Sequence, residues 1–273
     1  MATKKKTTKQ TSGAAGRVLL VGMLLVVLGA LGWLGWRWRA ELPLKTIEVA
    51  GARQANVDSL VALARIPPDA PLFSIDPVLV ADRVRRHPWV ASAAAKRRLA
   101  GVLTITIEER EPVVLVLDGK GQPSHYLDAG GYGLPLETPS DDGFSVSARD
   151  VPLLRGVGAA YHPVQPVENP SVQALLEALA STDPEAIILI SELEITPEGE
   201  VEGWLTPLQA GRPSISVQFG YAGFDEKLQR LRAFWRQAVQ TRPDRTFEKI
   251  DLRFDGQVVT VESPSEETSG EPT

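Results

Sequence analysis

The feature that most constrains this chain is an uninterrupted apolar run at residues 18–36, VLLVGMLLVVLGALGWLGW, which contains no charged side chain. As an α-helix, a run of this length extends about 28 Å, close to the hydrocarbon thickness of a bilayer. We therefore predict a single transmembrane helix that contacts the lipid bilayer through residues 18–36.

The residues that flank the apolar run predict its orientation. Residues 1–17 carry five cations and no carboxylate, although the whole chain has a net charge of −5. Positive flanks favour the cytoplasmic side, and Trp33, Trp36 and Trp38 cluster at the far end, where amphipathic rings prefer the interface. Bulky residues follow the run where a signal peptide would need small ones. We predict an uncleaved anchor, with a cytoplasmic basic tail and most of the chain outside the cytoplasm.

The next segment, residues 44–112, has the pattern of a β-α-α-β-β domain. Residues 44–50 alternate as a strand, and Asn56 and Asp76-Pro77 are start signals for two amphipathic helices. Residues 89–99 and 102–110 then read as two strands around a turn at Gly101. The first helix shows an apolar stripe, and the second carries two valines on one face; these residues are Val57, Leu60, Val61, Ala64, Val80 and Val84.

Residues 113–262 predict a β-rich domain with two helices, and together with the first domain they make the fold class α+β. One helix begins at Asn169-Pro170, and the other covers residues 224–240. Residues 129–150 look like an exposed loop, and residues 263–273 form an acidic tail too polar to order itself. The strands are predicted at residues 113–117, 124–131, 151–156, 186–196, 200–206, 214–220, 247–254 and 257–262.

Few residues of this chain are candidates for catalysis. The absence of cysteine excludes disulfides, thiolate metal sites and a cysteine nucleophile. The three histidines, His87, His125 and His162, have no partner at metal-ligand spacing. A carboxylate group at the end of a predicted strand, Glu108, Glu109 and Glu111, is compatible with a membrane-anchored envelope hydrolase, but such groups are more often a solvated strand edge. We predict no enzyme activity, no metal, no cofactor and no small-molecule substrate.

A second candidate is the basic stretch at residues 84–98, VRRHPWVASAAAKRR. Nucleic-acid binding is disfavoured, because the outer part of the chain is acidic and no aromatic residues interleave with the cations. Pro88 prevents the helix from continuing past His87, which makes His87 a helix-end residue, and Trp89 is placed to pack between helix and sheet. Docking of another protein remains open for Arg85, Arg86, Arg97 and Arg98.

The last predicted strand raises a further possibility, because it is apolar and lies near the end of the chain. An uncovered edge strand accepts a strand from a partner by main-chain hydrogen bonding. A strand paired on both sides fits the same residues equally well, so the sequence leaves the two alternatives open.

The order of these elements resembles the bacterial cell-division family FtsQ, called DivIB in Gram-positive bacteria. The similarity is carried by LFSID followed by VRRHPWV, by ITIEEREPV, by YLDAGG and by FEKIDLRF. It implies that the β-α-α-β-β unit is a POTRA domain. It also implies a non-catalytic scaffold of the divisome in the cell inner membrane, acting in septum formation with its bulk in the periplasm.

The resemblance further implies two sets of partners. FtsB and FtsL would bind the second domain, and other division proteins would bind the POTRA domain. By position, the closing strands of the family, with the helix at residues 226–239 behind them, place the partner-binding residues at Arg253, Phe254, Gln257, Val258, Val259 and Val261. Where the family often has tyrosine, this chain has Phe254, so a hydroxyl contact is missing there.

Overall fold

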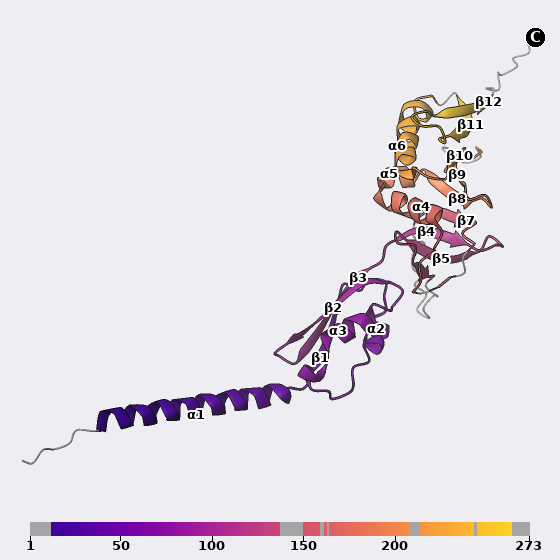
Figure 1. The fold of residues 1–273 in the computed structure, drawn as a ribbon. Helices are drawn as coiled ribbons and strands as arrows, with labels where there is room; N and C mark the ends of the chain where they lie inside the picture. Colours follow the sequence, from indigo (N-terminus) through magenta and orange to yellow (C-terminus); the bar gives the residue numbers. More distant parts are fainter. Residues whose placement is uncertain are drawn as a thin grey trace, which may run out of the picture. The chain divides into compact units, whose positions relative to one another are not determined.

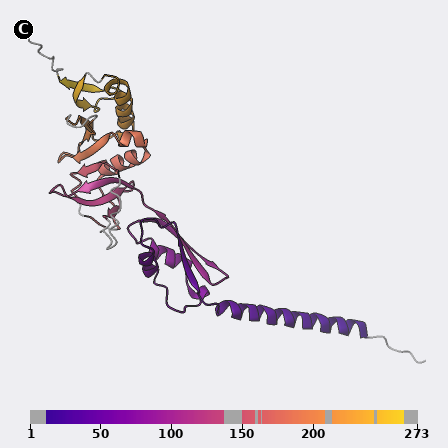
Figure 2. The same cartoon turned by 180° about the vertical axis from the view of Figure 1, so that it is seen from behind.

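The computed structural model describes residues 12–136, 150–158, 161–162, 164–207, 213–242 and 245–263. Most of the predicted basic tail (residues 1–11), part of the predicted loop (137–149) and nearly all of the acidic tail (264–273) lie outside these residues. The chain divides into two compact units: Met1–Arg85 with Ser92–Glu108, and Arg86–Ala91 with Glu109–Thr273. The ribbon is shown in Figure 1 and, from behind, in Figure 2.

The first helix, α1 (Ser12–Ala40), contains the predicted apolar run and extends beyond it at both ends. Its segment Leu19–Arg37 is long and apolar enough to cross a membrane, and none of that segment is buried inside the protein. Such a fully exposed apolar surface requires a covering of lipid in place of water. The helix therefore fits a single-pass membrane anchor.

The rest of the first unit has the predicted β-α-α-β-β order. Its three-stranded sheet has the order β1-β3-β2, with β1 parallel to β3. The predicted start signals are confirmed: Asn56 accepts hydrogen bonds from the backbone N–H groups of the first turn of α2, and Asp76 does the same for α3. The elements are β1 (Thr46–Ala50), α2 (Val57–Ala64), the short 3₁₀-helix η1 (Leu72–Ser74), α3 (Pro77–Val84), β2 (Val90–Arg98) and β3 (Val102–Glu109).

The core of this unit forms between the two helices and the sheet. Leu60 and Val84 from the helices are fully buried, as are Leu103 and Ile105 from β3. The predicted stripe on α2 is only partly right, because Val57 remains 46% exposed at the start of the helix. The alternation of β3 therefore sets which face of the sheet the helices cover.

The second unit is built on one nine-stranded sheet with the order β12-β11-β10-β9-β8-β7-β4-β5-β6. Figure 1 shows the helices on one face of this sheet, and the reverse view in Figure 2 agrees. The strands are β4 (Pro112–Leu117), β5 (Pro123–Asp128), β6 (Gly133–Pro135), β7 (Leu153–Arg155), β8 (Ile190–Ile195), β9 (Val201–Leu205), β10 (Ser216–Gly220), β11 (Thr246–Asp251) and β12 (Val259–Ser263). The helices are α4 (Pro170–Ser181), α5 (Pro184–Ile187) and α6 (Phe224–Phe234), which continues as a π-helical turn, η2 (Trp235–Val239).

The helices connect parallel strands, as crossover geometry requires. α4 and α5 lie between β7 and β8 in the chain, and α6 lies between β10 and β11; both strand pairs are parallel. Their apolar faces are buried in one core with the inward side chains of the sheet. The predicted apolar residues of α6 and η2 are all buried there: Leu228, Leu231, Trp235 and Val239.

Two sequence expectations are wrong in this unit. The strand predicted from residue 186 begins only at Ile190, because Asp183 caps a short helix, α5, with Pro184 at its first position. The domain therefore has a helix beyond the two expected. The predicted loop at 129–150 contains β6, which forms because this segment pairs with β5, with Leu134 opposite Tyr126. Leu134 is fully buried.

A buried ion pair joins two of the motifs on which the family resemblance depends. Arg110, from ITIEEREPV, lies 2.6 Å from the carboxylate of Asp128, from YLDAGG, and its guanidinium stacks on Tyr132. The other carboxylate oxygen of Asp128 accepts the N–H groups of Gly130 and Tyr132. The pair therefore fixes both the turn after β5 and the start of the β4–β5 sheet.

Acid should destabilise the second unit through His125, which is buried with Nδ1 3.0 Å from the Ser124 hydroxyl oxygen. Burial lowers the pKa of His125 below its ordinary value. Below about pH 6.5, His125 binds a proton in the unfolded chain that it does not bind in the folded chain. The free energy of unfolding therefore decreases as the pH is lowered. Urea titrations of the detergent-solubilised chain from about pH 7 to about pH 5 should show this fall. His125→Asn should make it shallower, and an unchanged slope would contradict the assignment.

Candidate functional site

The candidate site is the C-terminal hairpin of the sheet, formed by β11 and β12. β12 pairs antiparallel with β11, from Asp251 opposite Val259 to Thr246 opposite Ser263. Among the residues that the structure describes, no strand lies on the other side of β12. The alternative left open by the sequence is thus decided in favour of an edge strand, whose outer main-chain groups are available to a partner strand.

The apolar side chains of β12 point away from the core. Thr260 stands opposite Ile250, which is fully buried, so the threonine lies on the inward side of the strand. Val259 and Val261 occupy the other side and are 45% and 49% exposed. An edge strand normally keeps such residues inward, so the reversed alternation gives this edge an apolar outer face.

The loop between β11 and β12 is held by Arg230 of α6. One guanidinium nitrogen donates to the carbonyl oxygens of Phe254 (2.6 Å) and Gln257 (3.0 Å), and another donates to that of Leu252 (3.2 Å). Three carbonyls that follow β11 are thereby fixed by one side chain on the helix behind the sheet. The sequence did not single out Arg230, because an arginine within an amphipathic helix looks like any solvated cation.

Arg253, predicted to bind a partner, is held by Asp251. Its Nε and Nη2 atoms donate to both carboxylate oxygens at 2.7–3.2 Å, and Glu200 lies 3.8 Å away. The hydrogen bonds from Arg253 lower the pKa of Asp251, an effect that burial partly opposes. Arg253 therefore stiffens the end of β11, at the position where Val259 pairs.

The other predicted partner-binding residues form the outer surface of the same hairpin. Phe254 is 52% exposed in the loop, and Gln257 is exposed beside it. Val258 differs, since it is partly buried against the core. Phe254, Val259 and Val261 are thus exposed apolar residues of the hairpin, Phe254 in its loop and the two valines on β12.

A second cation of α6, the buried Lys227, holds the turn that precedes the helix. Its Nζ atom donates to the carbonyl oxygens of Phe219 (2.6 Å) and Ala222 (2.5 Å). Burial lowers the pKa of Lys227, with Arg230 contributing in the same direction. Two cations of α6 therefore hold two separate segments: Lys227 holds the turn that precedes the helix, and Arg230 holds the loop between β11 and β12.

The four arginines predicted as a docking surface do not form one cluster. Arg85 pairs with Asp82 just before β2, and Arg86 lies beside it in the chain. At the far end of that strand, Arg97 donates to the carbonyl of Phe73, and Arg98 lies 3.7 Å from Glu48. About seven residues of extended strand, roughly 23 Å, separate the two pairs.

The carboxylates considered for hydrolysis are not arranged as a facing pair. Glu108 accepts a hydrogen bond from Ser92, and Glu109, the next residue of β3, points to the opposite face because side chains alternate along a strand. Glu111 lies beyond the end of β3. Across the described part of the chain, no group of three or more potential ligands of the His, Asp or Glu type could hold a metal ion.

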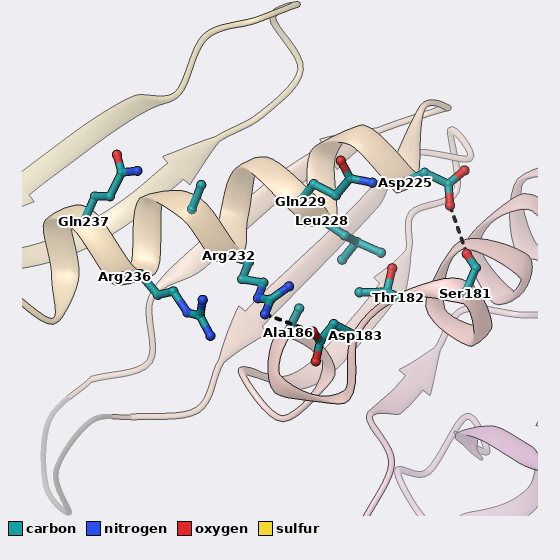
Figure 3. A pocket seen from close by; sticks show the side chains of 11 residues that line it. Ser181, Thr182, Asp183, Ala186, Asp225, Leu228, Gln229, Arg232, Arg236 and Gln237 are labelled. Atoms are coloured by element: carbon teal, nitrogen blue, oxygen red, sulfur yellow. Dashed lines mark hydrogen bonds and ion pairs between the residues drawn. The ribbon is translucent and has the colours of Figure 1, made fainter.

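A groove of about 600 Å³ lies between α6 and the α4–α5 connection (Figure 3). Arg232 lies 2.9 Å from Asp183 and 3.1 Å from Glu185, and Arg236 also pairs with Glu185. Asp225 accepts a hydrogen bond from Ser181 across the groove. The arginines of the groove are therefore paired with the carboxylates of Asp183 and Glu185, and these ion pairs fasten α5 to α6.

Comparison with known proteins decides the family. Residues 42–110 match the model of the POTRA domain, FtsQ-type, and residues 111–261 match FtsQ/DivIB, C-terminal related. The chain belongs to the FtsQ family of bacterial cell-division proteins. It is 44% identical to the cell division protein FtsQ of Rhodothermus marinus over 95% of this chain and 92% of that protein.

A second relative and one solved structure are also similar to this chain. It is 41% identical to FtsQ of Salinibacter ruber, over 91% of this chain and 93% of that protein. A solved structure of the major extracytoplasmic domain of DivIB from Geobacillus stearothermophilus covers 49% of this chain and 97% of its own, with 17% identity and a TM-score of 0.32. By the two family matches, the first unit is a POTRA-like unit, followed by the β-rich domain of the family.

Removal of the Arg230 guanidinium should loosen the hairpin. Arg230→Gln abolishes three hydrogen bonds from a charged donor, so we expect a loss of about 1.5–3 kcal/mol in the free energy of unfolding. We also expect faster amide hydrogen exchange across residues 252–262. Arg232→Gln, on the same helix but in the groove, is the control, and equal exchange at 252–262 in both variants would contradict the role given to Arg230.

Proposed function

We propose that this chain is a non-catalytic, single-pass scaffold of the cell-division machinery that binds FtsB and FtsL through the outer edge of β12. The observation that carries the proposal concerns β12, which in the described part of the chain pairs with β11 on one side and with no strand on the other. Its apolar residues, Val259 and Val261, face outward. Membership in the FtsQ family supports a role in division, since the curated relatives carry the name cell division protein.

The edge offers two kinds of interaction to a partner strand. Main-chain N–H and C=O groups of β12 provide a hydrogen-bonding ladder that does not depend on sequence. The two half-exposed valines and Phe254 provide specificity, and full burial of each valine adds on the order of 1 kcal/mol. Because Arg230 and Arg253 hold the loop and the end of β11, little ordering of this side is needed on binding.

We further propose that the N-terminus is cytoplasmic and that both units lie in the periplasm, at the division septum. The basic residues before α1 support this orientation. We place the domain boundaries at 44–112 for the POTRA domain and 113–262 for the β domain. Other division proteins would contact the POTRA domain, either at Arg85 and Arg86 or at Arg97 and Arg98, but not through one surface that joins all four.

Charge on the outer face of β12 should abolish partner binding. Burying a carboxylate in the interface is unfavourable, so Val259→Glu with Val261→Glu should reduce co-purification of the FtsB–FtsL pair by tenfold or more. Val78→Glu, at an exposed valine of α3, is the control and should leave co-purification unchanged. Full recovery of the pair with the double variant would sink the proposed site.

The proposed topology is testable because the chain has no cysteine of its own. In spheroplasts, which lack the outer membrane but keep an intact inner membrane, a membrane-impermeant maleimide should label Ser92→Cys. It should leave Lys5→Cys unlabelled until the inner membrane is permeabilised. The reverse pattern would place the bulk of the chain in the cytoplasm.

Depletion of the protein in its source organism tests the role in division directly. We expect filamentous cells, with rescue by the wild-type chain and by a Glu108→Gln, Glu109→Gln, Glu111→Gln variant. Failure of that variant to rescue, together with cell-wall cleavage by the purified chain, would favour the hydrolase hypothesis. Normal septation on depletion would contradict the division role.

A further inference from the structure

The turn between β2 and β3 exposes an apolar side chain among cations. Leu99 is 69% exposed at the tip of this hairpin and follows Lys96, Arg97 and Arg98. The tip is fixed to the segment that leaves α1, because the carbonyl of Gly101 accepts the N–H groups of Lys45 (2.7 Å) and Thr46 (3.3 Å). Neither the core of the unit nor the proposed partner edge uses Leu99.

The hairpin tip lies close to the end of the membrane-crossing segment. Lys45 is eight residues beyond Arg37, where the apolar segment ends, and three of those residues remain in α1. The connection therefore spans at most about 22 Å.

Contacts within the unit shorten this connection further. The carbonyl of Leu42 already accepts the N–H of Leu72 at 2.8 Å. The ring of Phe73 is shared by two arginines: the guanidinium of Arg39, in the last turn of α1, lies 4.2 Å from its centroid, and that of Arg97 lies 5.4 Å away. The end of β2 and the end of α1 thus meet on one side chain.

Cations dominate the surface around this junction. Glu41 and Glu48 lie there, and each forms an exposed ion pair, Glu41 with Arg37 and Glu48 with Arg98. Exposed pairs of this kind contribute little energy, so the guanidinium groups retain their capacity to bind phosphate. The cations are Arg37, Arg39, Lys45, Lys96, Arg97 and Arg98.

We propose that the β2–β3 hairpin tip, residues 96–100, rests on the surface of the membrane that α1 crosses. Leu99 enters the boundary between headgroups and acyl chains, and the neighbouring cations bind the phosphates of anionic lipids. The inference rests on the proposed membrane anchoring and adds a second attachment point. That attachment restricts rotation of the POTRA-like unit about the segment at residues 41–44.

Spin labelling of the full chain in lipid nanodiscs tests the contact, since the chain has no native cysteine. A nitroxide at Leu99→Cys in discs containing phosphatidylglycerol should show several-fold lower collision with a water-soluble nickel complex than one at Ser92→Cys, seven residues earlier in the chain and within β2. Adding Lys96→Glu and Arg98→Glu, or high salt, should remove this protection. Inorganic phosphate at matched ionic strength should have no further effect.

Each outcome bears on a separate part of the proposal. Equal, water-like collision at both positions in discs that retain the protein would overturn the lipid contact and leave the division role intact. Equal protection of position 99 in pure phosphatidylcholine would overturn the part played by anionic lipid. Failure of the chain to co-elute with the discs would overturn the anchoring itself.

Discussion

A hydrogen-bonded sheet that does not close on itself must end in strands with unpaired main-chain groups, and this constraint organises the second unit. Among the described residues, nine strands form one ladder, and this ladder ends at β12, which follows α6 and η2 in the chain. Proteins usually blunt such an edge with inward charges, bulges or proline. Here the outer face of the edge strand carries two half-exposed valines, and we propose that this edge is an interaction surface.

The helix behind the sheet, α6, holds the β11–β12 hairpin in place. α6 packs its apolar side into the core and uses two cations: Lys227 holds the turn before the helix, and Arg230 holds the loop between β11 and β12. Burying a cation is unfavourable unless carbonyl oxygens replace its lost hydration, and the buried Lys227 meets this condition with two carbonyls. The hairpin is thus ordered by the interior of the domain, so its outer surface can differ without a loss of fold.

In the first unit, the main constraint is the short connection between the membrane helix α1 and the POTRA-like unit. Within five residues of the end of α1 the chain is bonded to two other parts of the POTRA-like unit, at Leu72 and at Gly101. Gly101 suits this position because its φ is +87° and a Cβ there would lie 2.9 Å from the carbonyl oxygen of Pro43. The short connection and the hairpin tip beside it are what allow a lipid surface to orient this unit.

The sequence by itself determined the anchor, the helix starts at Asn56, Asp76 and Asn169, and the family, because these depend on local chemistry: an apolar run, capping side chains and the spacing of motifs. It missed α5 and β6, where a capping Asp183 and pairing with β5 outweigh the apolar pattern. Only the tertiary structure decided that β12 is an edge, that Val259 and Val261 face outward, and that Arg230 holds the loop before them. Strand neighbours and the face that a helix covers depend on contacts between residues far apart in the chain, and no local pattern encodes them.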